Sequence, residues 1–160
     1  TQASIAYYEE FNKDKIIWKE ISKESSFALD KNNYYNLDTS RIITGRDIEL
    51  ILGILNSKLF LFLFSNFYSG GNLGSTGIRF KSEFMKECPL PDIDLKYKED
   101  IINNVNSIID IKKNSLRKRI YLKDMTEKFE NNIDEIIYKY YQLTNQEISM
   151  IENYVSKILL

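Results

Sequence analysis

The segment from Ile48 to Phe64 limits how this chain can fold more than any other part of the sequence. Apolar residues recur at helical spacing through its first half, and the run Leu59–Phe64 is apolar on every side. A helix that is apolar on all of its faces has to be covered by other parts of the protein. A membrane span needs about 20 apolar residues, whereas Asn56, Ser57 and Lys58 interrupt this segment at its middle. The sequence therefore predicts a buried helix rather than a membrane span.

Three short apolar runs before this segment indicate strands, at residues 16–21, 27–29 and 34–43. Residues 30–33 have the composition of a turn between the last two runs. Thr44 is then the expected N-cap of the helix, and Asp47 completes a capping box near the positive helix end. We expect two or three short strands, followed directly by the helix.

A glycine-rich loop at residues 69–77 follows the buried helix. It leads into a short strand at 78–80 and a short helix near 82–86. Both prolines of the chain, Pro89 and Pro91, lie just beyond and force an extended backbone. We therefore place a domain boundary here, with a β-rich module at 1–91 and a helical part at 92–160.

The remainder of the chain has helical periodicity throughout. Apolar residues fall on one face from about residue 95 to 116, which describes an amphipathic helix of about 20 residues that suits packing against another long helix. Asp94 is its expected cap. A second helix is indicated by the apolar face from Phe129 to Tyr140, and Thr144 with Glu147 predicts a capping box before a final helix.

Composition excludes most familiar catalytic sites. The chain has no histidine and one cysteine, Cys88, which removes Ser-His-Asp and Cys-His catalysis, zinc sites built on histidine or cysteine, and an internal disulfide. The glycine-rich loop lacks the lysine and spacing of a phosphate-binding P-loop. Asp92 and Asp94 lie close together at a helix start, not on neighbouring strands that converge on a metal. We expect no catalytic residue and no metal site in this chain.

The formal net charge of −1 is unusual for a nucleic-acid-binding protein, because phosphate contacts normally need a basic surface. The charges are unevenly placed, however. No acidic residue lies between Glu49 and Glu83, and six basic residues occur within 112–123 without an acid. A basic run of this kind is usually a solvated helix face. The glycine-rich loop suits contact with an anionic backbone, because N–H groups and hydroxyls bond phosphate oxygens; a tight connection without a ligand is the alternative.

Aromatic residues are abundant, with 11 tyrosines, nine phenylalanines and one tryptophan. They can stack on bases, and they can equally build a β-rich core. We expect Trp18 in the core. If Tyr34 and Tyr35 lie in a strand, they point to opposite faces, so one of them should be exposed.

Several segments occur in a characteristic order. They are Ile16–Ser22, Phe27–Asp30, Asp38–Gly45, Leu52–Lys58, the 69–77 loop running into Ile78–Phe80, Pro89–Pro91, and a helical ending at 133–148. In this order the chain resembles the TaqI-like C-terminal specificity domain. The resemblance implies an α+β fold: a small β-rich target-recognition module with an embedded hydrophobic helix, followed by a long helix and a helical C-terminal tail.

The resemblance also implies a function. Such domains are the target-recognition parts of adenine-specific DNA methyltransferases and of fused restriction-modification enzymes. It implies cytoplasmic recognition of double-stranded DNA, with catalysis and S-adenosylmethionine in an N-terminal methyltransferase domain of the same polypeptide. The Thr1 start and the absence of an Asn-Pro-Pro-Tyr motif agree with a fragment that holds no cofactor.

Candidate DNA-binding residues are polar or aromatic side chains in turn or loop settings that suit base edges in the major groove. They are Lys31, Asn32, Asn33, Tyr34, Arg41, Asn72, Ser75, Thr76, Arg79 and Lys81. The alternative function is a helical protein–protein interaction module without direct DNA reading, in which the long helix at 95–118 pairs with a partner.

Overall fold

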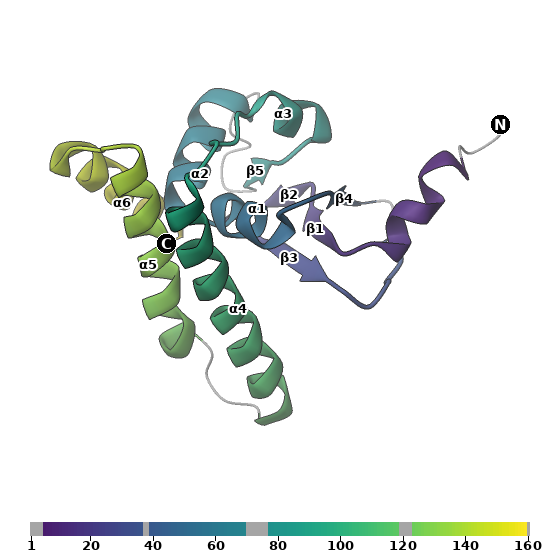
Figure 1. Ribbon diagram of the computed structural model, residues 1–160. Coiled ribbons are helices and arrows are strands. Elements are labelled where there is room, and N and C mark those ends of the chain that lie inside the picture. The colour runs from purple at the N-terminus through teal and green to yellow at the C-terminus, as the bar shows by residue number, and fades with distance from the viewer. Residues whose placement is uncertain (1–4, 37–38, 70–76, 119–122, 160) are drawn as a thin grey trace.

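The computed structural model describes residues 5–36, 39–69, 77–118 and 123–159 of the chain (Figure 1). Its architecture is α+β, as predicted: two small antiparallel sheets, a hydrophobic helical segment, and a helical C-terminal part. Figure 1 shows the long helices α4 (Leu95–Lys118) and α5 (Lys123–Tyr140) side by side on one flank of the molecule, with the strands on the other.

The larger sheet has three strands in the order β3-β1-β4. They are β1 (Lys15–Lys19), β3 (Phe27–Asp30) and β4 (Ser40–Thr44), and both pairings are antiparallel. β1 is central, with Trp18 opposite Phe27 on one side and Arg41 on the other. Trp18 is buried as predicted, and its indole N–H donates to the carbonyl of Phe80 at 2.8 Å.

The second sheet pairs β2 (Ile21–Ser22) with β5 (Ile78–Arg79). The sequence predicted one strand through residues 16–21, but Glu20 separates β1 from β2, and the two belong to different sheets. The apolar pattern misses this break because Ile21 continues the same composition into the neighbouring sheet. The strand at β5 is confirmed.

The third predicted strand is shorter than expected. The sequence favoured a strand from Tyr34 to Ile43, whereas β4 begins at Ser40. Tyr34 and Tyr35 precede it in non-strand backbone and are both exposed, at 64% and 57%. The cause is Asp30, whose carboxylate accepts the backbone N–H groups of Asn32 (2.7 Å) and Tyr34 (2.9 Å). These bonds hold residues 30–34 in a turn, so this part of the chain cannot have the extended backbone of a β-strand.

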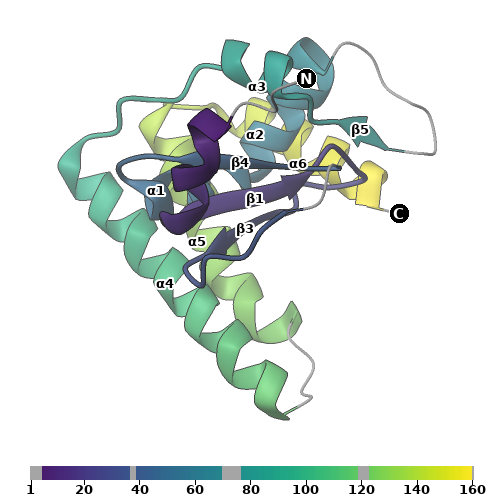
Figure 2. The same cartoon turned by 90° about the vertical axis from the view of Figure 1, so that its right-hand side faces the viewer.

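Asp30 also forms a buried ion pair at the same end of the sheet. Its Oδ2 lies 2.6 Å from Nζ of Lys15, and the side chains are 5% and 0% exposed. Lys15 Nζ also donates to the carbonyl of Phe11 at 2.8 Å. Phe11 belongs to the 3-10 helix η1 (Ile5–Asn12), which lies on the face of the sheet away from the helix α1 (Ile48–Leu55) (Figure 2). Burial opposes ionisation of Asp30, but the bonds from Lys15, Asn32 and Tyr34 outweigh it and lower the pKa of the carboxyl.

The hydrophobic segment forms two helices instead of one. They are α1 (Ile48–Leu55) and α2 (Lys58–Leu63), and α2 continues into the π-helix η2 (Phe64–Tyr68). Among the described residues, no single helix is long and apolar enough to cross a membrane; α1 with the 58–68 helix meets those requirements only as a pair bent by 60°.

The start of α1 differs from the prediction. Thr44 ends β4 and its hydroxyl donates to the Glu10 carboxylate, so it does not cap the helix. Asp47 is the N-cap residue, with a left-handed backbone (φ 56°) and no side-chain capping bond. Its carboxylate instead pairs with Lys98 of α4 at 2.7 Å. A tertiary ion pair has therefore replaced the local capping box.

The helices that follow were predicted more accurately. They are α3 (Ser82–Glu87), α4 (Leu95–Lys118), α5 (Lys123–Tyr140) and α6 (Asn145–Leu159). The second capping box is confirmed, because the Thr144 N–H donates to Glu147 Oε2 at 2.7 Å and the Glu147 N–H to Thr144 Oγ1 at 3.3 Å. The carbonyl of Asp94 accepts the N–H of Lys98 at 3.0 Å, which places Asp94 directly before α4.

One hydrophobic core joins the two parts of the chain. Phe27, Phe60, Phe64 and Phe80 form a chain of ring contacts with centroids 4.8–5.9 Å apart. α4 packs on α1 at Gly53, where an added Cβ would lie 2.7 Å from Ile101 Cγ2. Buried residues of α4, α5 and α6 belong to the same cluster: Ile101, Val105, Ile133, Ile137, Tyr138, Ile151 and Val155. The boundary near Pro91 stays a prediction.

The bend between α1 and α2 is held by side chains from both parts. Asn56 bonds the N–H and the carbonyl of Phe27, both at 3.1 Å, and Ser57 Oγ accepts the N–H of Phe60 at 3.2 Å. Asp134 of α5 accepts the Lys58 N–H at 2.8 Å, and its other oxygen lies 3.4 Å from Lys58 Nζ. The break in the apolar segment, at residues 56–58, is therefore the point where β3 and α5 are both hydrogen-bonded to the connection between α1 and α2.

We expect Asp30→Asn to destabilise the fold by about 3–5 kcal/mol, because it leaves the Lys15 ammonium buried without a countercharge. The double variant Lys15→Met/Asp30→Asn should recover much of this loss, since neither charge then remains inside. Urea unfolding of the three proteins measures both quantities. Equal losses in the single and double variants would show that the turn bonds of Asp30, and not the ion pair, carry its contribution.

Asp134 predicts a pH dependence of stability. Burial raises its pKa to about 6, against the lowering effect of Lys58. Between this value and that of the unfolded chain, near 4, the folded protein binds the extra proton. Stability therefore rises on acidification through this window, by up to about 3 kcal/mol relative to Asp134→Asn, which retains an acceptor for the Lys58 N–H. Unfolding curves between pH 7 and 4 test this. A wild type that loses stability relative to the variant would mean that Lys58 holds the carboxylate ionised.

Candidate nucleic-acid interface

The described candidate residues fall into two groups at opposite ends of the three-stranded sheet. Lys31, Asn32, Asn33 and Tyr34 follow β3 at the end where Asp30 pairs with Lys15. Arg41 lies at the other end, opposite Trp18, and Arg79 lies in β5. β1 separates the two ends by about 13 Å, given a rise of about 3.3 Å per residue. The structure therefore brings these residues together as two groups and not as one.

The first group is presented by the turn on Asp30. Asn33 has a left-handed backbone (φ 59°), and Tyr34 projects from the turn with 64% exposure. Lys31 is half-exposed and pairs with Glu49 at 2.6 Å and with Asp14 at 3.5 Å. The hydrogen bond with Glu49 raises the pKa of Lys31, so the ammonium stays charged. A buried carboxylate thus fixes the backbone from which the polar and aromatic side chains project.

An aromatic cluster lies beside this turn. Tyr35 contacts Tyr8 and Phe11 of η1, with ring centroids 5.5 and 5.2 Å apart. The sequence indicated only that tyrosines here can stack on bases; the contact between η1 and the turn has no local signal, because it joins residues more than twenty positions apart. Tyr8, Tyr34 and Tyr35 are all exposed, so this end of the sheet presents three aromatic rings to solvent.

The second group centres on Glu20, which sequence reasoning did not single out. Its Oε2 lies 3.0 Å from Arg41 Nη2, and its Oε1 lies 4.0 Å from Arg79 Nε. Glu20 stands between β1 and β2, where the chain passes from one sheet to the other. Two predicted DNA-binding arginines therefore meet at one carboxylate. The only signal in the sequence is an acidic residue that interrupts an apolar run.

Lys81 is close to the second group in sequence, because it follows Arg79 by two residues. Its Nζ stands 5.8 Å from the ring centre of Phe84, and Lys81 directly precedes α3. Asn72, Ser75 and Thr76 lie outside the described residues. Gly77, the residue before β5, has φ +119°, and a Cβ added to it would lie 2.7 Å from the Ser22 carbonyl oxygen. Only glycine fits this close approach to β2.

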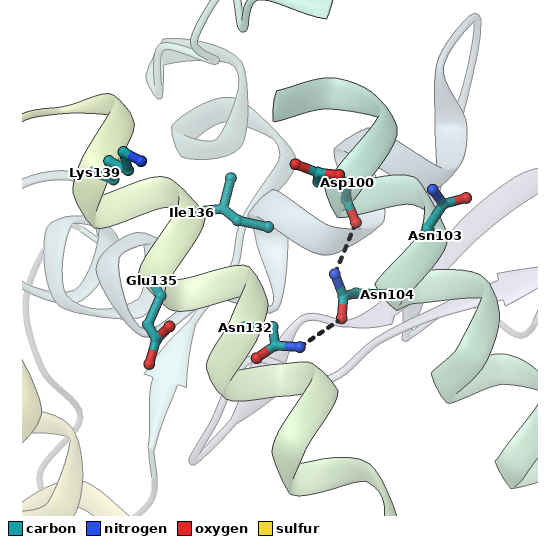
Figure 3. A pocket seen from close by; sticks show the side chains of 7 residues that line it. All are labelled: Asp100, Asn103, Asn104, Asn132, Glu135, Ile136 and Lys139. Carbon is teal, nitrogen blue, oxygen red and sulfur yellow. Dashed lines mark hydrogen bonds between the residues drawn. The ribbon is translucent and has the colours of Figure 1, made fainter. Parts of the chain in front are cut away.

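A separate hollow of about 290 Å³ lies between α4 and α5 (Figure 3). It is lined by Asp100, Asn103, Asn104, Asn132, Glu135, Ile136 and Lys139. The side-chain amide of Asn132 donates from Nδ2 to Oδ1 of Asn104 at 3.1 Å, which links the two helices across the hollow. Its lining holds two carboxylates and one ammonium, so the local charge repels phosphate and favours a polar or basic ligand. It contains none of the predicted DNA-binding residues.

The described residues contain neither a carboxylate cluster arranged for a metal ion nor an activated thiol. Across residues 5–36, 39–69, 77–118 and 123–159, no group of three or more aspartate, glutamate or cysteine side chains is placed to hold a metal ion. Cys88 is partly buried, and burial raises its pKa, which disfavours the nucleophilic thiolate. What the two groups offer is a set of hydrogen-bond donors, cations and aromatic rings, which is the chemistry of binding.

Residues 1–90 match the family model of the TaqI-like C-terminal specificity domain. The match runs from η1 to the end of α3 and contains both groups of candidate residues. No curated protein matches the chain. Because the matched residues make up more than half of the sequence, the chain belongs to the family of TaqI-like C-terminal specificity domains.

Proposed function

We propose that this protein reads a specific sequence in double-stranded DNA, as the target-recognition domain of a restriction-modification enzyme. The observation that carries the proposal is the family match over residues 1–90, since a specificity domain of this family selects the DNA target of its enzyme. The described side chains support it. They supply arginine and lysine, which pair with guanine, and asparagine, which pairs with adenine, on the major-groove edges of the bases.

The spacing of the two groups also suits a short DNA site. About 13 Å along β1 corresponds to about four base pairs at 3.4 Å per step. In this proposal, the turn after β3 and the arginines at the far end of the sheet contact separate parts of one short sequence. This arrangement favours recognition of several base pairs by one small domain.

Catalysis belongs to another part of the enzyme in this proposal. We assign it to an adenine-N6 methyltransferase domain N-terminal to this chain in the same polypeptide, with or without a fused endonuclease. S-adenosylmethionine would bind there and supply the methyl group. The present chain lacks an Asn-Pro-Pro-Tyr motif, so its own part is to position the target base by holding the flanking sequence. The enzyme would act in the cytoplasm, where its DNA substrate lies.

The charge balance shapes how the domain would bind. Residues 1–91 carry equal numbers of acidic and basic side chains, 11 of each. Such a surface gives few phosphate contacts, so a larger share of the affinity has to come from bases. We infer that phosphate binding is shared with the catalytic domain, and that the isolated chain binds DNA weakly but selectively.

A helical interaction module is the alternative function. The feature that favours it is the hollow between α4 and α5, whose two carboxylates and three amides suit a polar or basic segment of a partner protein. The two functions use different surfaces, so they are separable by substitution.

We expect the chain to enrich one sequence from a pool of random DNA duplexes at low ionic strength. Binding to that duplex, measured by fluorescence anisotropy over a salt series, should weaken in Lys81→Ala, with a salt slope lower by about one, because one phosphate contact is lost. Lys139→Ala removes the same charge from the hollow between α4 and α5 and serves as the matched control. Loss of DNA binding in the control alone would move the interface to the helices and contradict the proposal.

A further inference from the structure

Arg41 and Arg79 come from different sheets and are held at one carboxylate. The backbone of Glu20 is fixed on both sides: its N–H donates to the Thr39 carbonyl at 3.3 Å, and its own carbonyl accepts the Phe80 N–H at 2.7 Å. These two neighbours directly precede β4 and directly follow β5. The Glu20 carboxylate therefore has a defined position relative to the strands that carry the two arginines.

The carboxylate contacts the two arginines in different ways. Arg41 Nη2 lies 3.0 Å from Glu20 Oε2, and Arg41 Nη1 donates to the Ser40 carbonyl at 3.1 Å. Both terminal nitrogens of Arg41 are thus engaged. Arg79 faces Glu20 with Nε, but the separation of 4.0 Å exceeds a hydrogen bond. Among the described residues, this buried Nε has no hydrogen-bond acceptor.

The orientation of Arg79 follows from this contact. In a planar guanidinium, the edge formed by Nε–H and the nearer terminal nitrogen differs from the edge formed by the two terminal nitrogens, so a carboxylate on the Nε side leaves the end-on pair of N–H groups pointing in another direction. The Arg79 side chain is 38% exposed, so its outer part reaches solvent. The site favours a ligand with two acceptors in one plane.

We propose that Glu20 is a positioning residue that gives the two arginines different roles in DNA reading. Arg41 has a supporting role, because its terminal nitrogens are bonded to Glu20 and to the Ser40 carbonyl. Arg79 contacts the base, and its two terminal nitrogens donate to O6 and N7 of a guanine in the major groove. A small closing movement of Glu20 onto Nε would then complete the hydrogen bonding of Arg79. This assignment rests on the proposed function and names the base that the second group of residues selects.

Selection from random duplexes, followed by sequencing, tests the assignment on the full 160-residue chain. The wild type should show a guanine preference at one position that Arg79→Lys weakens, because an ammonium lacks the planar fork that fits O6 and N7 together. Glu20→Gln should reduce the preference at that same position by about tenfold, while affinity for unrelated DNA stays equal or rises because a negative charge is removed. Arg41→Ala should weaken the same position and no other.

Glu24→Gln is the matched control, since Glu24 is an exposed carboxylate four residues further along the chain. It makes the same charge change and should leave the guanine preference intact. Circular dichroism and thermal unfolding confirm that each variant is folded; if Glu20→Gln unfolds, Glu20→Asp retains the charge, shortens the reach to Arg41, and should reduce the same preference.

Three results would overturn the assignment while leaving the proposed function in place. They are an unchanged guanine preference in folded Glu20→Gln, loss of a different base position in Arg41→Ala, and equal selectivity of Arg79→Lys and wild type. A wild-type chain that enriches no sequence at all would contradict the proposed function itself. The two failures are therefore distinct.

Discussion

The interruption of the apolar segment at Asn56, Ser57 and Lys58 is the constraint around which the structure is arranged. A straight helix through residues 48–68 would present an apolar surface longer than the small sheet can cover. The bend of 60° folds that surface onto two sides of one core instead. Breaking a helix exposes backbone groups that need partners. Here Ser57 Oγ accepts the Phe60 N–H and Asp134 of α5 accepts the Lys58 N–H, while the Asn56 side chain binds the backbone of Phe27 in β3. The site of the break therefore determines where the sheet and the tail attach.

The helical part of the fold could be predicted from sequence because its signals are local. The spacing of apolar residues in α4 to α6 reports one buried face in each helix, and the Thr144–Glu147 box is complete within four residues. The same pattern failed at Thr44, where Glu10 and Lys98 bind the two residues that would have formed the box. Tyr34 and Tyr35 have strong strand propensity, yet the buried Asp30 holds their backbone in a turn. In each wrong prediction, a residue distant in sequence or a buried charge competes with the local preference.

The candidate site was predictable in its residue types but not in its grouping. Arg41, Arg79 and the residues after β3 carry the chemistry of base reading, and their turn and strand settings could be recognised without a structure. That Arg41 and Arg79 meet at Glu20 depends on the passage of the chain between two sheets, which no local pattern reports. The division of the remaining residues between two ends of β1 likewise needs the strand register. Asn72, Ser75 and Thr76 stay predictions.

The continuous core has a consequence for building chimaeric enzymes. A recognition module is a natural unit to transplant, because exchanging it would change the DNA target of the enzyme. In this protein the segment matched to the family ends before α4, but Gly53 of α1 is in contact with Ile101, and the amide that opens α2 is bound by Asp134. A graft that stopped at the last proline would leave these surfaces facing water or a foreign helix. The transplantable unit therefore includes the tail helices, and its length is dictated by packing rather than by the extent of the family resemblance.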